Sequence, residues 1–266
     1  MTVATARFCV LVPCLNEERA IGPLLQTVLA ECADVIVVDD GSDDRTPQIV
    51  SALPVTLIRH RERRGKGEAL RSGFREALKR GYDAVLTMDG DGQHAASDIP
   101  RIARTAQRFP DSMVIGARML NRGLQPAARH AANDFADWGI SWSCGRRVID
   151  SQSGQRWYPR AAVELVDLPA QDFVFEAAIL IAASRDLDMP IISVPIESRY
   201  QGEFRISHFR PVRDVARITF YTIGRILHYR DVMASYRRSH GVPTPIHDPD
   251  GSLDPLSDAS AQPGHP

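Results

Sequence analysis

Apolar runs and amphipathic segments alternate through the first 117 residues, and this alternation constrains the fold more than any other feature of the chain. Several runs are apolar at consecutive positions, as expected of strands that are buried on both faces. The predicted strands cover residues 8–12, 35–38, 55–58, 84–88 and 113–117, and helix-length segments lie between them at about 17–31, 46–53, 66–80 and 98–108. This order predicts an α/β fold with a mainly parallel, Rossmann-like sheet that is flanked by helices.

Polar turns follow three of the predicted strands. They cover residues 13–18, 39–42 and 89–94. The carboxyl ends of parallel strands meet at one edge of an open sheet, and ligands bind along that edge. We therefore expect the three turns to lie close together and to form the site.

The third turn has the sequence DGDGQH, in which Asp89, Asp91 and Gln93 alternate with glycines. Alternate residues of an extended chain point to one side, so their oxygens can aim at a common point. Hard oxygen ligands suit Mg²⁺ or Mn²⁺, with substrate phosphate and water as further ligands. The alternative is an acidic, glycine-rich turn that caps a strand. A calcium EF-hand is disfavoured because His94 stands at the sixth loop position and Arg101 at the twelfth.

The first two turns have two interpretations each. Backbone N–H groups near Asn16 and Glu17 can meet a nucleotide, and the two side chains can bond a ribose or base. The alternative is that Asn16 caps the following helix. In the second turn, a carboxylate of the sequence DDGS can recognise a base or ribose, or the sequence can form a plain turn.

Several other functions are disfavoured. The sequence GKG at 65–67 lacks the spacing of a P-loop, and no G-x-G-x-x-G follows the first strand, as a nicotinamide or flavin enzyme requires. A net charge of -1 creates no field that recruits nucleic acid, and the three tryptophans are more typical of a core or pocket wall. No apolar stretch is long enough to span a bilayer, and four cysteines without C-x-x-C spacing favour the reducing cytoplasm.

The second half of the chain is less regular up to a predicted helix at 173–185 and a short strand at 190–196. Basic and apolar residues then interleave from 205 to 238, which predicts an amphipathic helix that either packs on the core or lies on an anionic membrane surface. A polar tail rich in Pro, Asp, Ser and Gly follows and should be disordered. The predicted division is 1–204, 205–240 and 241–266.

The order of the motifs is more specific than any one of them. PCLNEE at 13–18 is followed by VDDGS at 38–42, GKG at 65–67, DGDGQ at 89–93, DSQSG at 150–154 and VPI at 194–196. This series resembles the family 2 glycosyltransferases of GT-A fold, in particular the branch of dolichyl-phosphate mannosyltransferase and the bacterial polyprenyl-phosphate glycosyltransferases. The resemblance spans about residues 7–217, and Gln155 departs from it because relatives often carry an apolar residue there.

The resemblance implies an inverting transfer of a hexose from a UDP- or GDP-linked sugar donor, with Mg²⁺ or Mn²⁺, to a polyprenyl-phosphate or other lipid-linked acceptor. It implies four groups of residues: Pro13, Leu15, Asn16, Glu17, Asp40, Lys66 and Asp89 for the nucleotide sugar; Asp89, Asp91 and Gln93 for the metal; Gln152, Arg205 and Ser207 for the acceptor phosphate; and Asp91, Arg118, Arg129 and Glu176 for catalysis. The expected localisation is the cytoplasm; the alternative is a peripheral contact with the cytoplasmic face of the membrane.

The acceptor decides whether a base is needed. A phosphate is already anionic, so arginines that align it matter more than a proton acceptor. A hydroxyl acceptor requires a carboxylate base, for which Asp172 and Glu176 are the candidates. A non-catalytic sugar-nucleotide-binding partner is the alternative from another class. Nucleotidyl transfer is disfavoured because the usual glycine-rich, basic loop after the first strand is absent.

Overall fold

The computed structural model describes residues 6–120, 127–170, 172–197, 211–240 and 246–251. The described chain forms a seven-stranded sheet in the order β3-β2-β1-β4-β6-β5-β7. The strands are β1 (Phe8–Cys14), β2 (Val35–Asp39), β3 (Thr56–Arg59), β4 (Ala84–Thr87), β5 (Met113–Ala117), β6 (Arg156–Pro159) and β7 (Ile191–Pro195). Only β6 runs antiparallel to its neighbours within this sheet. The predicted α/β fold with a mainly parallel sheet is confirmed.

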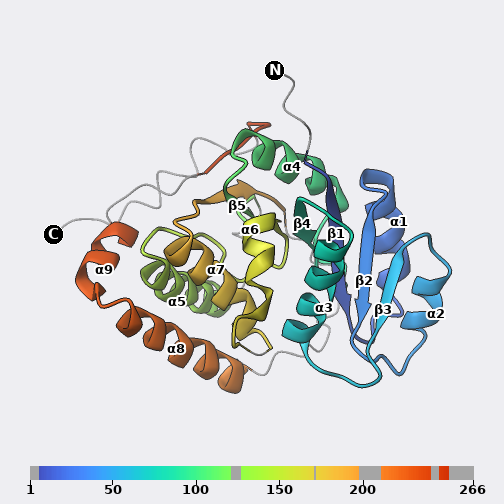
Figure 1. Cartoon of the computed structure of the whole chain (residues 1–266), viewed down its shortest axis with the longest axis horizontal. Coiled ribbons are helices and arrows are strands. Elements are labelled where there is room, and N and C mark those ends of the chain that lie inside the picture. The colour runs from blue at the N-terminus through green and yellow to red at the C-terminus, as the bar shows by residue number, and fades with distance from the viewer. Residues whose placement is uncertain (1–5, 121–126, 171, 198–210, 241–245, 252–266) are drawn as a thin grey trace.

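Helices connect the strands and cover the sheet (Figure 1). They are α1 (Ile21–Glu31), α2 (Thr46–Ser51), α3 (Lys66–Lys79), α4 (Ile99–Arg108), α5 (Ala127–Cys144), α6 (Arg160–Val163), α7 (Val174–Asp186), α8 (Pro211–His228) and α9 (Val232–His240), with short 3₁₀ turns at Ala96–Asp98 and Glu164–Asp167. In the figure, α8 and α9 form an outer rim on the side away from α1 and α2.

The central strand β1 is apolar at consecutive positions because both of its faces are covered. Cys9 and Leu11 belong to one buried cluster, which includes Phe74 of α3. Val10 and Val12 point the other way into a second cluster, which includes Leu25 of α1. Polar groups are therefore confined to the strand ends, where the site lies.

Two elements in the second half of the chain were not predicted. The 18-residue helix α5 lies where an irregular region was expected, and the four-residue strand β6 was missed altogether. A strand of four residues that begins with an arginine gives almost no periodic signal. The single helix expected at 205–238 is two helices, because the chain turns at Arg230, whose φ is 57°.

Part of the tail that was expected to be disordered packs on the sheet domain. The His247 N–H donates to the Ser193 carbonyl oxygen at 3.0 Å, and the His247 ring lies 2.9 Å from the Thr105 hydroxyl. Asp248 also pairs with Arg101 at 3.2 Å. The expectation is wrong for residues 246–251, and the rest of the tail lies outside the described residues.

Candidate active site

The first two polar turns are joined by hydrogen bonds. The Asn16 N–H donates to the Ser42 hydroxyl at 2.9 Å, and the Asp43 N–H donates to Asn16 Oδ1 at 3.0 Å. The Glu17 N–H donates to the Thr46 hydroxyl at 2.8 Å. Helix α1 begins only at Ile21, and its N-cap residue Ala20 makes no side-chain cap. The alternative in which Asn16 caps this helix is therefore wrong, because its side chain connects the turns.

The third turn packs directly on the first. A Cβ atom added at Gly90 would lie 3.0 Å from Cys14 Cβ and 3.1 Å from the Pro13 carbonyl oxygen, so this approach favours glycine. All three turns thus meet at the carboxyl edge of the sheet, as predicted. Pro13 is part of β1 and is buried, whereas Leu15 is half-buried and Asn16 is exposed.

Asp40 is buried and holds the loop that leads into α3. Its Oδ1 accepts from the His60 ring at 2.7 Å and from the Arg64 N–H at 2.9 Å, and its Oδ2 accepts from the Gly65 N–H at 2.8 Å. Because a carboxylate accepts, His60 Nδ1 carries the proton and Nε2 is left to the Ser72 hydroxyl, 2.9 Å away. Sequence analysis missed His60, which no motif marks. Asp40 thereby fixes the residue before Lys66.

Lys66 links the third turn to α7. Its Nζ lies 2.7 Å from Asp89 Oδ1 and 3.1 Å from Glu176 Oε2. Burial lowers the pKa of Lys66, but the two carboxylates outweigh burial and the net pKa is raised. Burial likewise raises the pKa of Asp89, and the ammonium of Lys66 outweighs it, so the pKa of Asp89 is held well below its usual range. Both groups are charged at neutral pH.

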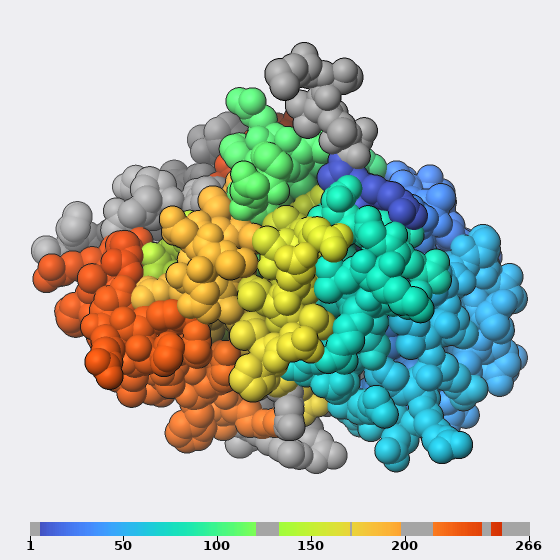
Figure 2. All heavy atoms as spheres, in the orientation of Figure 1, coloured from blue at the N-terminus to red at the C-terminus, as the bar shows by residue number. Residues whose placement is uncertain are grey.

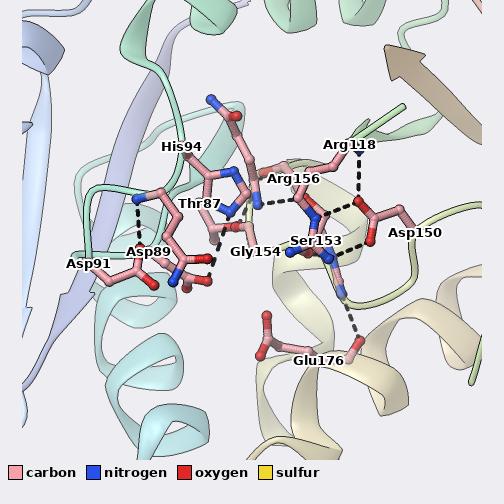
Figure 3. A network of polar contacts seen from close by, with 12 residues as sticks. Thr87, Asp89, Asp91, His94, Arg118, Asp150, Ser153, Gly154, Arg156 and Glu176 are labelled. Atoms are coloured by element: carbon pink, nitrogen blue, oxygen red, sulfur yellow. Dashed lines mark hydrogen bonds and ion pairs between the residues drawn. The ribbon is translucent and has the colours of Figure 1, made fainter. Parts of the chain in front are cut away.

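Asp89, Asp91 and His94 lie together on one side of the polar network in Figure 3. Asp91 Oδ1 accepts from the Gln93 N–H at 3.0 Å, which shapes the turn. His94 is buried, with Nε2 4.0 Å from Asp89 Oδ2, and burial is the main cause that lowers the pKa of His94 to about 4. The imidazole is therefore neutral at pH 7.

The third turn fits a metal that shares its ligands with a substrate. Nowhere in the described residues do three His, Cys, Asp or Glu side chains form a group that could hold a metal by themselves. Mg²⁺ is usually held by one or two carboxylates together with substrate phosphates and water. Asp89 and Asp91 offer carboxylates of this kind, and Gln93 adds an amide oxygen. These donors suit a hard cation whose coordination shell is completed by the diphosphate of a substrate.

Strand β6 brings a second loop to the same edge. Because β6 is antiparallel to β4, its first residue Arg156 pairs with Thr87, the last residue of β4. Residues 150–155 therefore arrive next to Asp89. A Cβ atom at Gly154 would lie only 2.2 Å from Asp89 Oδ2, and the Thr87 hydroxyl donates to the Gly154 carbonyl oxygen at 2.8 Å.

Arg118 follows β5 and is held by Asp150. Its Nε donates to Asp150 Oδ2 at 2.8 Å and its Nη2 to Oδ1 at 2.6 Å, a two-pronged ion pair. Burial raises the pKa of Asp150, but its bonds to Arg118 outweigh burial and lower it. Figure 3 shows this pair across the network from Asp91. Gln152 lies on the same loop with an exposed side chain.

Arg156 is a buried cation that sequence analysis did not single out. Its guanidinium donates to the carbonyl oxygens of Ser151 (2.5 Å), Ser153 (2.7 Å) and Glu176 (3.3 Å), as Figure 3 shows in part. It thus ties the 150–155 loop to the first turn of α7. The neighbouring Gln155 donates to the Ala95 carbonyl oxygen at 3.2 Å, while its buried Oε1 has no hydrogen-bond partner in the described chain.

Three of the predicted site residues cannot be placed in the site. The side chain of Arg129, on α5, and the whole of Arg205 and Ser207 lie outside the described residues. Of the other predicted residues, Lys66 contacts both Asp89 and Glu176. Arg118, just after β5, bonds to Asp150 of the loop that carries Gln152. Asp172 is turned toward α8, where its Oδ2 pairs with Arg217 at 2.8 Å.

Characterised relatives share most of the chain. An undecaprenyl-phosphate mannosyltransferase of Micrococcus luteus is 31% identical over 76% of this chain and 88% of its own length. A polyprenol monophosphomannose synthase of Mycolicibacterium smegmatis is 30% identical, over 63% and 67%. A UDP-N-acetylglucosamine–dolichyl-phosphate N-acetylglucosaminyltransferase of Methanococcus voltae is 28% identical, over 71% and 84%.

Solved structures support the fold. Glucosyl-3-phosphoglycerate synthase of Mycobacterium tuberculosis in complex with phosphoglyceric acid superimposes with a TM-score of 0.62 at 22% identity, over 90% of this chain and 82% of that one. Its complex with Mn²⁺ and UDP-glucose gives 0.60 at 23% identity, over 90% and 81%. The sequence model of glycosyl transferase family 2 matches residues 9–159, more than half of the chain. The chain therefore belongs to glycosyl transferase family 2 and is a glycosyltransferase with a GT-A fold.

Proposed function

We propose that this enzyme transfers a hexose, with inversion, from a UDP- or GDP-linked donor to a polyprenyl phosphate, and that it depends on Mg²⁺ or Mn²⁺. The observation that carries the proposal is the contact of Lys66 with both Asp89 and Glu176. It joins the turn that we assign to the donor with the helix that we assign to the acceptor side. Three relatives are named for dolichyl-phosphate, polyprenol monophosphomannose or undecaprenyl-phosphate, which supports a prenyl phosphate as the acceptor.

On the donor side, the joined turns at Asn16 and Asp40 are assigned to the nucleoside, and Asp89, Asp91 and Gln93 to the metal. Departure of the nucleoside diphosphate builds negative charge on its phosphates. A divalent cation, when bound, stabilises that charge. Lys66 adds a fixed positive charge beside the same turn, and its raised pKa keeps it protonated at neutral pH.

On the acceptor side, a phosphate monoester needs alignment and charge compensation. The Arg118 guanidinium is oriented by two hydrogen bonds to the Asp150 carboxylate, on the loop that also carries the exposed Gln152. We assign the acceptor phosphate to this group together with Arg129, Arg205 and Ser207. Because the phosphate oxygen is anionic, no proton has to be removed in the transfer step.

A hydroxyl acceptor is the second candidate, since the fold neighbour is named a glucosyl-3-phosphoglycerate synthase. Such a reaction needs a carboxylate base. Glu176 is placed for this role beside Lys66, whereas Asp172 is engaged with Arg217 and packs against Gly65. The contacts of Asp172 therefore make Glu176 the better candidate base.

Two conservative variants separate these candidates. With a prenyl phosphate acceptor, Glu176→Gln and Asp172→Asn should each change kcat by less than about ten-fold. A hydroxyl acceptor predicts a loss of about 10²-fold or more for one of them, because general base catalysis contributes at least that much. Transfer of radiolabelled sugar to farnesyl phosphate and to 3-phosphoglycerate measures both reactions in parallel.

Calorimetry tests the donor and the metal, and it separates the enzyme from a binding protein without turnover. Binding of one nucleotide sugar should require Mn²⁺ or Mg²⁺ and should be lost in Asp91→Asn. Metal-independent binding would contradict the assignment of the third turn. Binding that is intact while neither transfer nor donor hydrolysis is detectable would favour the non-catalytic alternative.

The four free cysteines are in keeping with a reducing cytoplasmic location.

A further inference from the structure

Exposed apolar side chains concentrate on one group of helices. Eight large apolar side chains are exposed in the described chain, and seven of them lie on α5, α8 and α9, which pack against one another. They are Phe135, Trp138, Val215, Phe220, Ile223, Leu227 and Met233. Exposed apolar side chains that gather on neighbouring helices in this way often mark a binding surface. No helix of the described residues is both long and apolar enough to cross a bilayer.

Helix α8 is apolar on two faces. Ile218 and Tyr221 pack on the buried core, while Phe220, Ile223 and Leu227 point outward and are 75%, 48% and 62% exposed. The outward residues are spaced three and four apart, so they form one stripe along the helix. The inner face has its partner in the core, and the outer stripe needs another one.

The charges around the stripe indicate an anionic partner. Residues 215–240 contain five arginines, one aspartate and no glutamate or lysine, in a chain whose net charge is -1. The one aspartate, Asp231, is neutralised by Arg185 at 2.6 Å and by Arg238. Arg230 and Arg237 are exposed and form no ion pair within the described chain. Arg237 lies one helical turn after the exposed Met233 on α9, and Arg230 lies in the turn between α8 and α9, three residues after Leu227.

A chain of contacts links α8 to the loop that carries Lys66. Arg217 of α8 pairs with Asp172, and Asp172 lies against Gly65 and Gly67, the neighbours of Lys66. Contacts through Asp172 therefore connect α8, part of the outer rim in Figures 1 and 2, with the two glycines that flank Lys66. The acceptor phosphate is assigned above to Arg118, Gln152 and Arg129, and Arg129 lies on α5, which packs against α8. The chain of a lipid bound there would extend toward α8.

We infer that the outer face of α8 and α9 is a docking surface for an anionic lipid bilayer, defined by Phe220, Ile223, Leu227, Met233, Arg230 and Arg237. The apolar stripe sits at the level of the acyl boundary and the two arginines contact lipid phosphates, as in helices that lie in the plane of a membrane. The inference rests on the proposed function for its purpose, the delivery of a lipid phosphate, but its test needs no substrate.

The experiment is co-sedimentation of the full chain with vesicles of phosphatidylglycerol and phosphatidylcholine, compared with phosphatidylcholine alone. Binding should favour the anionic vesicles and weaken at high salt. Phe220→Ser combined with Leu227→Ser should weaken binding at least ten-fold, and Arg230→Ser combined with Arg237→Ser should remove the preference for anionic lipid. Phe220→Leu with Leu227→Ile keeps the stripe apolar and should bind normally. Arg108→Ser, an exposed arginine at the end of α4, is the charge control.

Three outcomes would overturn the inference: wild-type protein that stays in the supernatant, a Phe220→Ser/Leu227→Ser variant that sediments like wild type, and a concentration-dependent dimer that this variant abolishes. The last would make the face an interface between copies. Sugar transfer to farnesyl phosphate in the absence of vesicles is measured beside each variant. Vesicle binding without transfer contradicts the proposed function alone, and transfer without vesicle binding contradicts the docking surface alone.

Discussion

Gly154→Ala tests the active site most directly. The added Cβ would lie 2.2 Å from Asp89 Oδ2, 2.5 Å from Cγ and 2.6 Å from Oδ1. Ordinary carbon contacts begin at about 3.5 Å, so the carboxylate has to move by more than about 1 Å. The obstructed atoms are the end of a side chain, so the fold can remain while Asp89 leaves both Lys66 and the position assigned to the metal.

A misplacement of about 1 Å in a catalytic site can cost about 10²-fold in rate. We therefore expect kcat for sugar transfer to farnesyl phosphate to fall about 100-fold in Gly154→Ala, while the melting temperature changes by only a few degrees. The matched control is Gly224→Ala on α8, where an added Cβ meets no atom within 4 Å. It should leave the rate unchanged and stabilise the helix by about 0.5–1 kcal/mol. Wild-type kcat in Gly154→Ala would refute the assignment of Asp89.

Three further predictions concern buried polar groups. Arg156→Met should lower the free energy of unfolding in urea by about 3 kcal/mol or more, because it leaves buried carbonyl oxygens unpaired, and Arg156→Lys should recover only part of this loss. Asp150→Asn should be less stable than wild type near pH 7. Because the folded-state pKa of Asp150 is lowered, its contribution is present above about pH 3.9 and disappears as the pH falls further, so acid titrations of the two proteins should converge. His60→Phe should weaken nucleotide binding in calorimetry by about ten-fold, since it removes one of the hydrogen bonds that hold the Asp40 carboxylate; equal affinity would show that the backbone donors hold Asp40 unaided.

The fold up to residue 117 was predictable because both faces of its strands are buried. Consecutive apolar residues in β1 and β2, separated by helix-length segments, leave few alternatives to a parallel sheet. The edge on which the three turns meet then followed from topology. Boundaries were less accurate: α1 begins at Ile21 instead of residue 17, because the Glu17 carbonyl oxygen closes a turn with the N–H groups of Ala20 and Ile21.

The acceptor half was harder to predict because its order depends on long-range contacts. Strand β6 has four residues and is defined by its pairing with β4 and β5. Arg156 gives no periodic signal, and its role depends on carbonyl groups that only the fold brings together. Asp172 was proposed, together with Glu176, as the carboxylate base that a hydroxyl acceptor requires. Its pairing with Arg217 depends on the placement of α8, which no local pattern specifies.

The reversed direction of β6 has a consequence for how enzymes of this shape can diversify. The residues that we assign to the donor come from the first 94 positions, whereas the loop that flanks Asp89 comes from positions 150–155, after the chain has passed through α5. Under the proposed function, insertions or exchanges between β5 and β6 would change the acceptor side and leave the residues assigned to the nucleotide in place. The tightest of the described approaches between these two parts, Gly154 against Asp89, limits how far such changes can go.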